Sequence, residues 1–427
     1  MPDSRALRIA LVAPPLERVP PRAYGGTERI VHELVRELDR RGHAVTLFAS
    51  GDSEPPANGR LIPTVDHALR PTGFGGDASP YFYSTVLDVL RRSDEFDLVH
   101  AHIDWPGILL AHVTSVPVVN TFHGRIDFPF AARLFSSPPR GLVAISRAQA
   151  HLCPDVAWEA VVHNGLNLSD APFERRAGED LCFVGRVAPE KGIVDAMEVA
   201  NLAGRKLRIA AKIGPRPDEK AYYENVFVPA LKAAGTSVEF LGEIGPRDRD
   251  RLFAESAASL MPGSWPEPFG LVAIESLACG TPIVARRAGA LPEIIRDGVD
   301  GFLADDPQAM AFSLKRIGQL DRAAIRASVL ERFSAERMTN DYLAVYHSML
   351  DVDRSSAKAQ PTLGLAASAV PWPEAGRTVE GGRPTLRSAV SASLGEGAGA
   401  LAGAGAKVSS PTVEAETVEA GTSRRPD

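Results

Sequence analysis

The chain has 427 residues, of which 44% are hydrophobic and 23% are charged, and its formal net charge is −6. This length is more than one hydrophobic core usually organises, so two domains are expected, and the weak negative charge gives no reason to expect a nucleic-acid partner. No run reaches the roughly 18 apolar residues of a membrane-spanning helix and the first residues do not resemble a signal peptide, so we expect a cytoplasmic protein, with peripheral membrane contact left open.

The N-terminal half begins with a β–α–β unit. Residues 7–13 form an apolar run typical of a buried strand, Gly25-Gly26 opens an amphipathic helix after a proline-rich loop, and residues 44–49 form the next strand. The unit lacks a GxGxxG fingerprint, which makes NAD binding a poor fit. A long loop is predicted over 59–80. Further strands are expected at 97–100, 116–120, 141–145 and 160–163.

A second series of strands and helices follows a predicted hinge at 164–167. Its strands are expected at 181–184, 207–213, 238–241, 258–261 and 282–285. Because alternating strands and helices produce parallel sheets, the expected fold class is α/β, with two Rossmann-like domains facing one another. Ligands of such sheets bind outside the carboxyl ends of the strands, so the site is predicted in the cleft between the domains.

The C-terminal part changes composition after a last helix, predicted at 335–350. From 351 to 427 small and polar residues dominate, and Trp372 is the only aromatic residue. Such a segment buries too little apolar area to offset an ordering cost of roughly 1–2 kcal/mol per residue. We therefore predict a disordered, low-complexity tail over 351–427.

Two carboxylates, Glu267 and Glu275, flank a proline-containing turn and a predicted helix over 271–278. Gly270 leaves room for a ligand near the main chain, and a helix N-terminus offers N–H groups and a positive dipole end to an anion. Carboxylates that bind hydroxyls, beside an anion-binding helix start, favour a sugar joined to phosphate. A buried helix with two surface acids remains the alternative at this point.

Arg186 and Lys191 lie five residues apart, on a loop and a helix start. A guanidinium and an ammonium that converge on a diphosphate would stabilise the charge that grows as a sugar–phosphate bond breaks. The main-chain N–H groups of Phe269, Gly270 and Leu271 could reach the same phosphate or the sugar. Two solvated loop charges are the alternative interpretation of Arg186 and Lys191.

Four motifs occur together in this order: Gly25-Gly26, then Thr121-Phe122-His123-Gly124, then Gly185-Arg186 with Lys191-Gly192, then Glu267 with Glu275. In this combination the chain resembles the retaining glycosyltransferases of family 4 (GT4, glycosyltransferase group 1), which have the GT-B fold. The resemblance covers roughly residues 5–350.

The resemblance implies an N-terminal acceptor domain over 1–165, completed by the helix at about 335–350, and a C-terminal nucleotide-sugar donor domain over 166–334. It implies transfer of a hexose from a UDP- or GDP-linked donor to an acceptor hydroxyl with retention, by front-face substitution. The acceptor could be a glycan, a lipid-linked sugar or a small molecule. No metal and no cofactor besides the donor substrate are expected.

The resemblance also assigns roles to residues. It implies that His123 touches the donor sugar near the reacting carbon, that Glu267 binds sugar hydroxyls and that Glu275 binds the ribose. The expected catalytic residues are His123, Arg186, Lys191 and Glu267, and the expected donor-binding residues are Gly25, Gly26, Phe269, Gly270, Leu271 and Glu275.

Two alternative functions remain. One is another GT-B enzyme, a sugar-nucleotide epimerase or a phosphorylase, and the other is a non-catalytic protein that binds nucleotide sugars or glycans. His100, His102 and Asp104 resemble a metal cluster in spacing, since two residues apart on a strand share one face. Further ligands are lacking, so we expect an acceptor-side or structural role for them.

Overall fold

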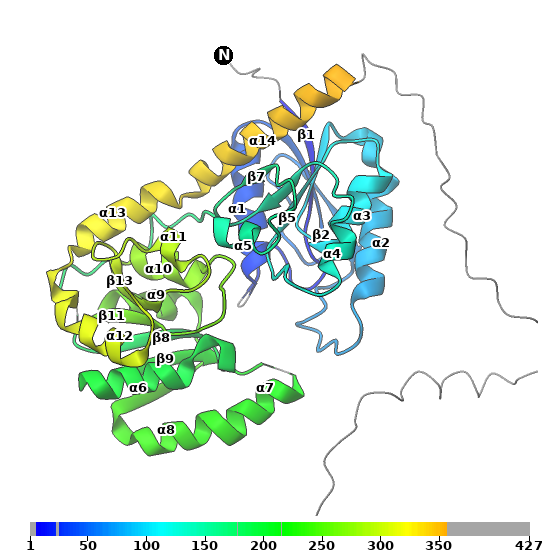
Figure 1. The fold of residues 1–427 in the computed structure, drawn as a ribbon. Coiled ribbons are helices and arrows are strands. Elements are labelled where there is room, and N and C mark those ends of the chain that lie inside the picture. Colours follow the sequence, from blue (N-terminus) through cyan, green and yellow to red (C-terminus); the bar gives the residue numbers. More distant parts are fainter. Residues whose placement is uncertain (1–5, 23–24, 177, 215, 357–427) are drawn as a thin grey trace, which may run out of the picture. The chain divides into compact units, whose positions relative to one another are not determined.

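The structure, a computed structural model, describes residues 6–22, 25–176, 178–214 and 216–356, with side chains to residue 351. The described residues belong to one compact unit, in which the chain folds around two separate parallel sheets (Figure 1). Of the tail predicted from 351 onward, residues 357–427 lie outside the described residues.

The first sheet has seven parallel strands in the order β3-β2-β1-β4-β5-β6-β7. Its strands are β1 (Arg8–Val12), β2 (Ala44–Ser50), β3 (Arg60–Val65), β4 (Leu98–Ala101), β5 (Val118–Phe122), β6 (Leu142–Ala144) and β7 (Ala160–Val161). Its helices are α1 (Gly26–Arg40), α2 (Ser79–Leu90), α3 (Trp105–Val113), α4 (Ala131–Leu134) and α5 (Arg147–His151).

The second sheet has six parallel strands in the order β10-β9-β8-β11-β12-β13. They are β8 (Leu181–Arg186), β9 (Leu207–Lys212), β10 (Val238–Gly242), β11 (Ala258–Met261), β12 (Ile283–Arg286) and β13 (Gly301–Ala304). Its helices are α6 (Ile193–Ala203), α7 (Pro217–Tyr222), α8 (Val228–Ala234), α9 (Pro246–Glu255), α10 (Leu271–Ala278), α11 (Leu291–Ile294), α12 (Pro307–Ser313) and α13 (Arg322–Arg332).

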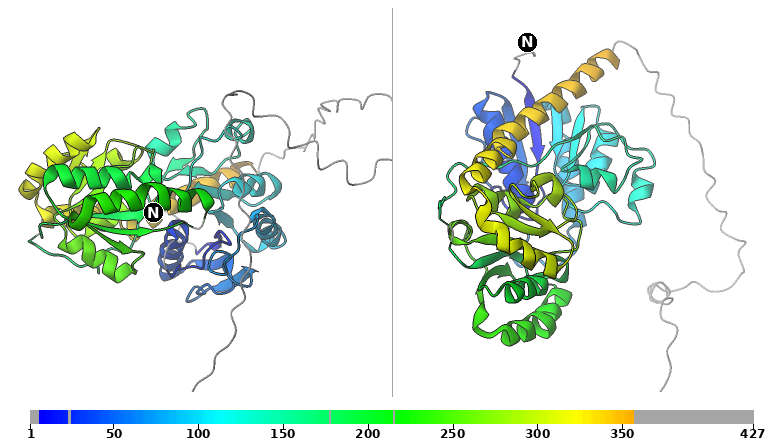
Figure 2. Two further views of the ribbon diagram at one scale, coloured as in Figure 1. Left: turned by 90° about the horizontal axis from the view of Figure 1, so that it is seen from below. Right: turned by 60° about the vertical axis from the view of Figure 1, so that its left-hand side comes forward.

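The last helix, α14 (Ala335–Ser356), returns from the second sheet to the first and packs against α1 (Figures 1 and 2). Its apolar stripe includes Tyr342 and Tyr346, which are fully buried. One hydrophobic cluster runs from β1 and α1 through α10 and α13 to α14. The two halves therefore share a core as well as a chain connection.

The helix predicted over 271–278 is confirmed with those bounds. Helix α5 is capped by Ser146, whose hydroxyl accepts a hydrogen bond from the backbone amide of Gln149 at 2.9 Å. The loop predicted over 59–80 is wrong in part, because β3 occupies Arg60–Val65 at a sheet edge. The last helix continues to Ser356 rather than ending at 350.

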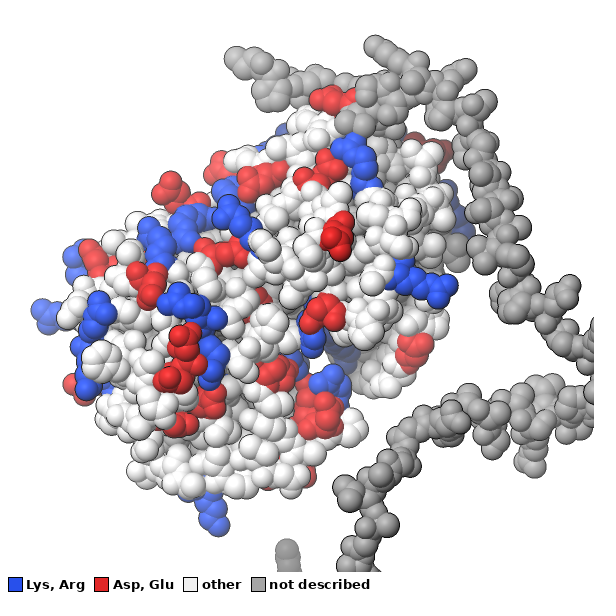
Figure 3. Space-filling model, in the orientation of Figure 1, with Lys and Arg blue, Asp and Glu red and all other residues white. Residues whose placement is uncertain are grey.

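Basic and acidic side chains are interspersed on the face shown in Figure 3, with no large area of one sign. This mixture agrees with the small net charge. Among the described residues, none of the helices has both the length and the apolar character needed to cross a bilayer.

Candidate active site

The carboxyl ends of strands from both sheets border one cavity of about 850 Å³. Every site residue predicted from the sequence lines it. From the N-terminal half these are Gly25, Gly26 and His123, and from the C-terminal half Arg186, Lys191, Glu267, Phe269, Gly270, Leu271 and Glu275. The expectation that the motifs converge at strand ends thus agrees with the cavity lining.

Lys191 and Glu267 form an ion pair on the C-terminal wall of the cavity. The Lys191 ammonium lies 2.5 Å from Glu267 Oε2, which also accepts a hydrogen bond from Trp265 Nε1 at 3.1 Å. Gly192 has a φ of +67°, and a Cβ there would lie 2.8 Å from the Gly263 amide nitrogen. Only glycine fits this turn without strain, so the Lys191-Gly192 motif has a local structural cause.

Arg186 ends β8 and is held by two carboxylates. Its guanidinium donates to Glu219 at 2.5 Å and to Glu190 at 2.8 Å. The side chains of Arg186 and Lys191 are 27% and 24% exposed, so neither is a fully solvated loop charge. Both cations line the cavity but have carboxylate partners, which an incoming anion must replace or join.

The start of α10 contributes main chain rather than side chains. Gly270 precedes the helix with a φ of +103°, a left-handed conformation that glycine tolerates best. The first amides of a helix have no partner within it, so the Leu271 amide can donate outside the helix. The Phe269 ring is 2% exposed and packs against His163 and Phe333. Its side chain therefore belongs to the core, and only its main chain can serve the cavity.

Glu275 lies one turn into α10 and is 3% exposed. Its Oε1 forms ion pairs with Arg29 of α1 at 2.5 Å and with Arg249 of α9 at 2.9 Å. The pair with Arg29 joins the two halves across the cavity. The residue expected to bind ribose thus meets two guanidinium groups in this structure.

Gly25 and Gly26 bring the start of α1 close to the opposite half. A Cβ on Gly26 would lie 3.5 Å from Leu271 Cδ1, and a Cβ on Gly25 would lie 2.7 Å from the Pro21 ring. Glu28, in the first turn of α1, lines the cavity and is 3% exposed. Burial raises the pKa of Glu28 to about 7, although Arg70 acts in the opposite direction.

His123 follows β5 on the N-terminal wall. Its amide donates to Asp104 Oδ1 at 2.8 Å, and its Nε2 lies 2.8 Å from Nδ1 of His102. Burial lowers the pKa of His123 to about 3 and also lowers that of His102. Burial raises the pKa of Asp104 to about 6, although hydrogen bonds from the amides of His123 and Gly124 act to lower it. Both imidazoles are therefore neutral near pH 7.

Comparison with known proteins gives the family. Residues 24–170 match the model described as Glycosyltransferase Family 4, and residues 170–320 match Glycosyl transferases group 1. The D-inositol 3-phosphate glycosyltransferase of Thermobifida fusca is 30% identical over 372 residues, covering 73% of this chain and 85% of that protein. The chain belongs to glycosyltransferase family 4.

Further relatives agree with this family. The alpha-maltose-1-phosphate synthase of Mycolicibacterium smegmatis is 26% identical to this glycosyltransferase over 400 residues, 80% of this chain and 100% of that protein. The crystal structure of Anabaena HepE in complex with UDP and glucose superposes with a TM-score of 0.62 at 18% identity, covering 80% of this chain and 100% of that one. The predicted GT-B fold is confirmed.

Several residues that line the cavity of the glycosyltransferase, or support it, were not identified from the sequence. Glu28 and Arg29 directly follow the Gly25-Gly26-Thr27 segment, so proximity to a motif was the available signal. Arg249 lies in the first turn of α9, and its guanidinium is directed at Glu275. Glu219 partners Arg186 from a helix 33 residues away, and no local pattern indicates that contact.

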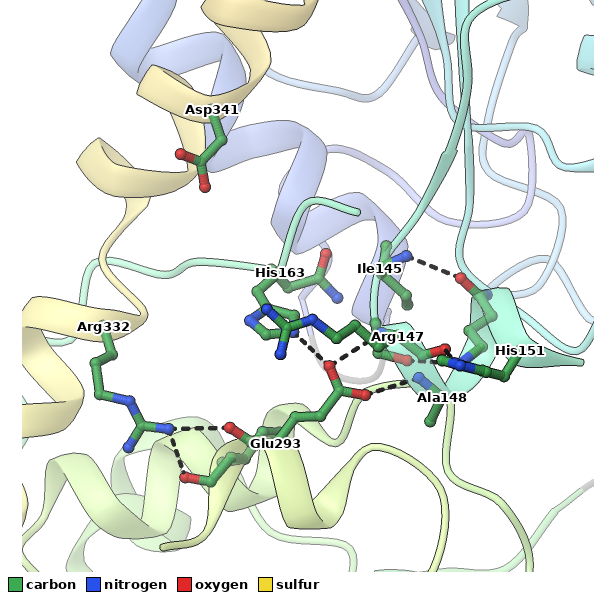
Figure 4. A network of polar contacts seen from close by, with 12 residues as sticks. Ile145, Arg147, Ala148, His151, His163, Glu293, Arg332 and Asp341 are labelled. Carbon is green, nitrogen blue, oxygen red and sulfur yellow. Dashed lines mark hydrogen bonds and ion pairs between the residues drawn. The ribbon is translucent and has the colours of Figure 1, made fainter. Parts of the chain in front are cut away.

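A polar network also connects the two halves of the glycosyltransferase near the cavity (Figure 4). The Glu293 carboxylate accepts hydrogen bonds from the amides of Arg147 and Ala148 at 2.9 and 2.7 Å, and lies 2.8 Å from His163 Nε2. Burial acts to raise the pKa of Glu293, but these bonds outweigh it and hold the pKa below its ordinary value. Arg332 donates to the backbone carbonyls of Glu293 and Ile294, which fixes α11 behind this contact.

Proposed function

We propose that this family 4 glycosyltransferase transfers a hexose from a UDP- or GDP-linked donor to an acceptor hydroxyl with retention of anomeric configuration, without a resident metal or cofactor. The observation that carries the proposal is the Lys191–Glu267 pair beside Arg186 and the start of α10, facing His123 across one cavity. The donor binds the C-terminal half and the acceptor binds the N-terminal half.

In this proposal the diphosphate lies against Arg186, Lys191 and the first amides of α10. These positive groups stabilise the charge that develops as the sugar–phosphate bond breaks. Lys191 and Trp265 both donate hydrogen bonds to Oε2 of Glu267, so its Oε1 remains available to a sugar hydroxyl. The structure of HepE with UDP and glucose supports a uridine nucleotide as the first donor to test.

Retention follows in the proposal from front-face substitution. A double displacement needs a carboxylate that attacks the anomeric carbon. Glu267 is engaged by Lys191 and Glu275 by Arg29 and Arg249, so both carboxylates suit binding better than attack. The leaving phosphate then accepts the proton of the acceptor hydroxyl as the new bond forms on the same face.

Two variants and one control test the site. We expect Lys191→Ala and Glu267→Ala to lower transfer at least about 100-fold, because each removes an interaction with the charged or reacting part of the donor. Lys206→Ala is the matched control, since Lys206 pairs with Glu239 at 2.7 Å on the outside of the same half. Transfer at the wild-type rate by Lys191→Ala or Glu267→Ala would refute the role given to that residue.

The donor and the stereochemistry need separate experiments. Thermal-shift measurements with UDP, GDP, ADP and dTDP should show stabilisation by one nucleotide, about 2.7 kcal/mol at 100 times its dissociation constant. Proton NMR of the first product then gives its anomeric configuration before any mutarotation. An inverted product would refute retention, and donor epimerisation without acceptor would favour the epimerase alternative.

A further inference from the structure

His102 and His123 form a buried imidazole pair on the N-terminal wall of the cavity. His102 Nδ1 and His123 Nε2 are 2.8 Å apart, and the ring centroids are 5.1 Å apart. Because both rings are neutral, one nitrogen must donate and the other must accept. The position of a single proton in this contact therefore decides which hydrogen-bonding group His123 presents to the cavity.

The second nitrogen of His102 identifies the donor. His102 is 1% exposed, and its Nε2 has no hydrogen-bond partner among the residues that the structure describes. If His123 donated from Nε2, His102 would carry its proton on Nε2, as a buried and unpartnered N–H. If His102 donates from Nδ1, its Nε2 is only an unpartnered lone pair. Orphaned buried N–H groups are the rarer of the two, so His102 is the donor.

This choice sets the tautomer of His123. With Nε2 accepting from His102, the proton of neutral His123 is on Nδ1. His123 lines the cavity, and within the described part of the chain its Nδ1 has no recorded hydrogen bond. We propose that His102 is a positioning residue that holds His123 as an Nδ1–H hydrogen-bond donor toward the donor sugar.

His100 supports the pair from behind. Its ring centroid is 4.0 Å from that of His102. Both of its nitrogens are occupied, Nδ1 by the Tyr346 hydroxyl at 2.7 Å and Nε2 by Thr121 Oγ1 at 2.8 Å. Tyr346 lies on α14, so the returning helix fixes the plane against which His102 packs.

The backbone on both sides of the pair is also constrained. Asp104 has a φ of +50°, which is uncommon for a residue other than glycine. Its carboxylate accepts from the His123 amide, and its carbonyl accepts from Asn120 Nδ2 at 3.0 Å. A Cβ on Gly107 would lie 1.9 Å from Asn120 Oδ1. The loop from β4 to α3 is therefore built tightly around the end of β5, where His123 begins.

The inference rests on the proposed function only for the identity of the bound ligand. A donor at Nδ1 can serve a sugar hydroxyl or ring oxygen, whereas a lone pair there would act as a base. His123 thus binds and polarises the sugar and does not remove a proton from the acceptor.

The tautomers can be measured without turnover. Long-range ¹H–¹⁵N correlation spectra of the ¹⁵N-histidine-labelled full chain distinguish Nδ1–H from Nε2–H rings, and His102→Asn and His123→Asn spectra assign the two signals. We expect Nδ1–H at both residues. An Nε2–H tautomer at His123 would overturn the proposal, whether or not any transfer is detected.

Kinetics test the consequence. His102→Leu keeps volume but removes the donor, and we expect kcat to fall roughly 10- to 100-fold with the donor KM changed less than about threefold, as for loss of one orienting hydrogen bond. His102→Asn places an amide donor near the Nδ1 position and should restore most of the rate. Wild-type kcat in His102→Leu, or equal losses in both variants at unchanged thermal stability, would contradict the positioning role. Absence of transfer in the wild type would refute the proposed function alone.

Discussion

Replacing Glu28 with glutamine should stabilise the glycosyltransferase, and increasingly so as the pH rises. Burial raises the pKa of Glu28 from 4.5 to about 7. Between these values the folded state keeps a proton that the unfolded state has released. Folding is therefore penalised as the pH rises through this window, and the penalty is complete above pH 7.

The size of the effect follows from the shift. A difference of about 2.5 pKa units corresponds to about 3 kcal/mol at 1.36 kcal/mol per unit. About 2.5 kcal/mol of this arises between pH 5 and pH 8. Glutamine is neutral throughout, so Glu28→Gln removes the penalty. For a cooperative unit of roughly 350 residues, with an unfolding entropy of about 2.1 cal/mol/K per residue, we expect the Tm difference between variant and wild type to grow by roughly 3–4 °C from pH 5 to pH 8.

The assay is thermal unfolding of both proteins at pH 5, 6, 7 and 8 at constant ionic strength. Glu37→Gln, on the same helix, is the matched control. Its pKa is lowered, chiefly by a hydrogen bond from Arg40, so any stability that its charge provides is complete above pH 4.5 and its Tm difference should be flat over this range. A flat difference for Glu28→Gln as well would refute the assignment of a raised pKa to Glu28.

Two further predictions concern pairs that cross between the halves. Glu275→Ala should lower the free energy of unfolding by roughly 3 kcal/mol, because Arg29 would lose this carboxylate and Arg249 would keep only Asp250 as its partner; urea denaturation measures this, and a loss below about 1 kcal/mol would contradict it. Glu293→Ala should cost about 2 kcal/mol by leaving His163 and the Arg147 and Ala148 amides without their acceptor. Glu331→Ala, at an exposed position near the end of α13, serves as the control for the second variant and should leave stability unchanged within about 0.5 kcal/mol.

The order of elements was predictable where local patterns are strong. The helix over 271–278 has an apolar run between Gly270 and Gly280, and both glycines have positive φ. The convergence of the motifs also followed from a general rule, since residues at the carboxyl ends of parallel strands share one edge of a sheet. This rule needs no knowledge of how the two halves contact each other.

The edge strand β3 shows where local patterns mislead. Arg60–Val65 contains Pro63, and a proline within an apolar run argues against a central strand. The strand order places β3 at the edge of the first sheet, where a missing N–H is tolerated because one side of the strand has no partner. The sequence does not indicate that an edge position is available, because that depends on the whole strand order.

Partner identities in the cavity were not predictable from spacing. Glu267 was expected to serve the sugar and Lys191 the phosphate, yet they lie 2.5 Å apart, with 76 residues between them in sequence. Glu28 is one of several acidic residues of α1, and nothing in the sequence indicates that it is buried and faces the cavity. Such contacts depend on how two sheets and the loops at their strand ends are placed, and that placement is tertiary information.

In the proposed function, the ion pairs change what the cavity must do when it binds a donor. Arg186 and Lys191 are each bound to carboxylates before any anion arrives, so a diphosphate gains less than it would from two unpaired cations. The same carboxylates hold both side chains in place, which lowers the ordering cost of binding and directs the charges at one position. Cations fixed in this way interact most favourably with the state of the ligand that carries the most negative charge. The ligand competes with the carboxylates for these cations, and it competes better as negative charge develops on the leaving phosphate. In the proposed function, the pairs therefore serve differential stabilisation of the transition state more than ground-state affinity.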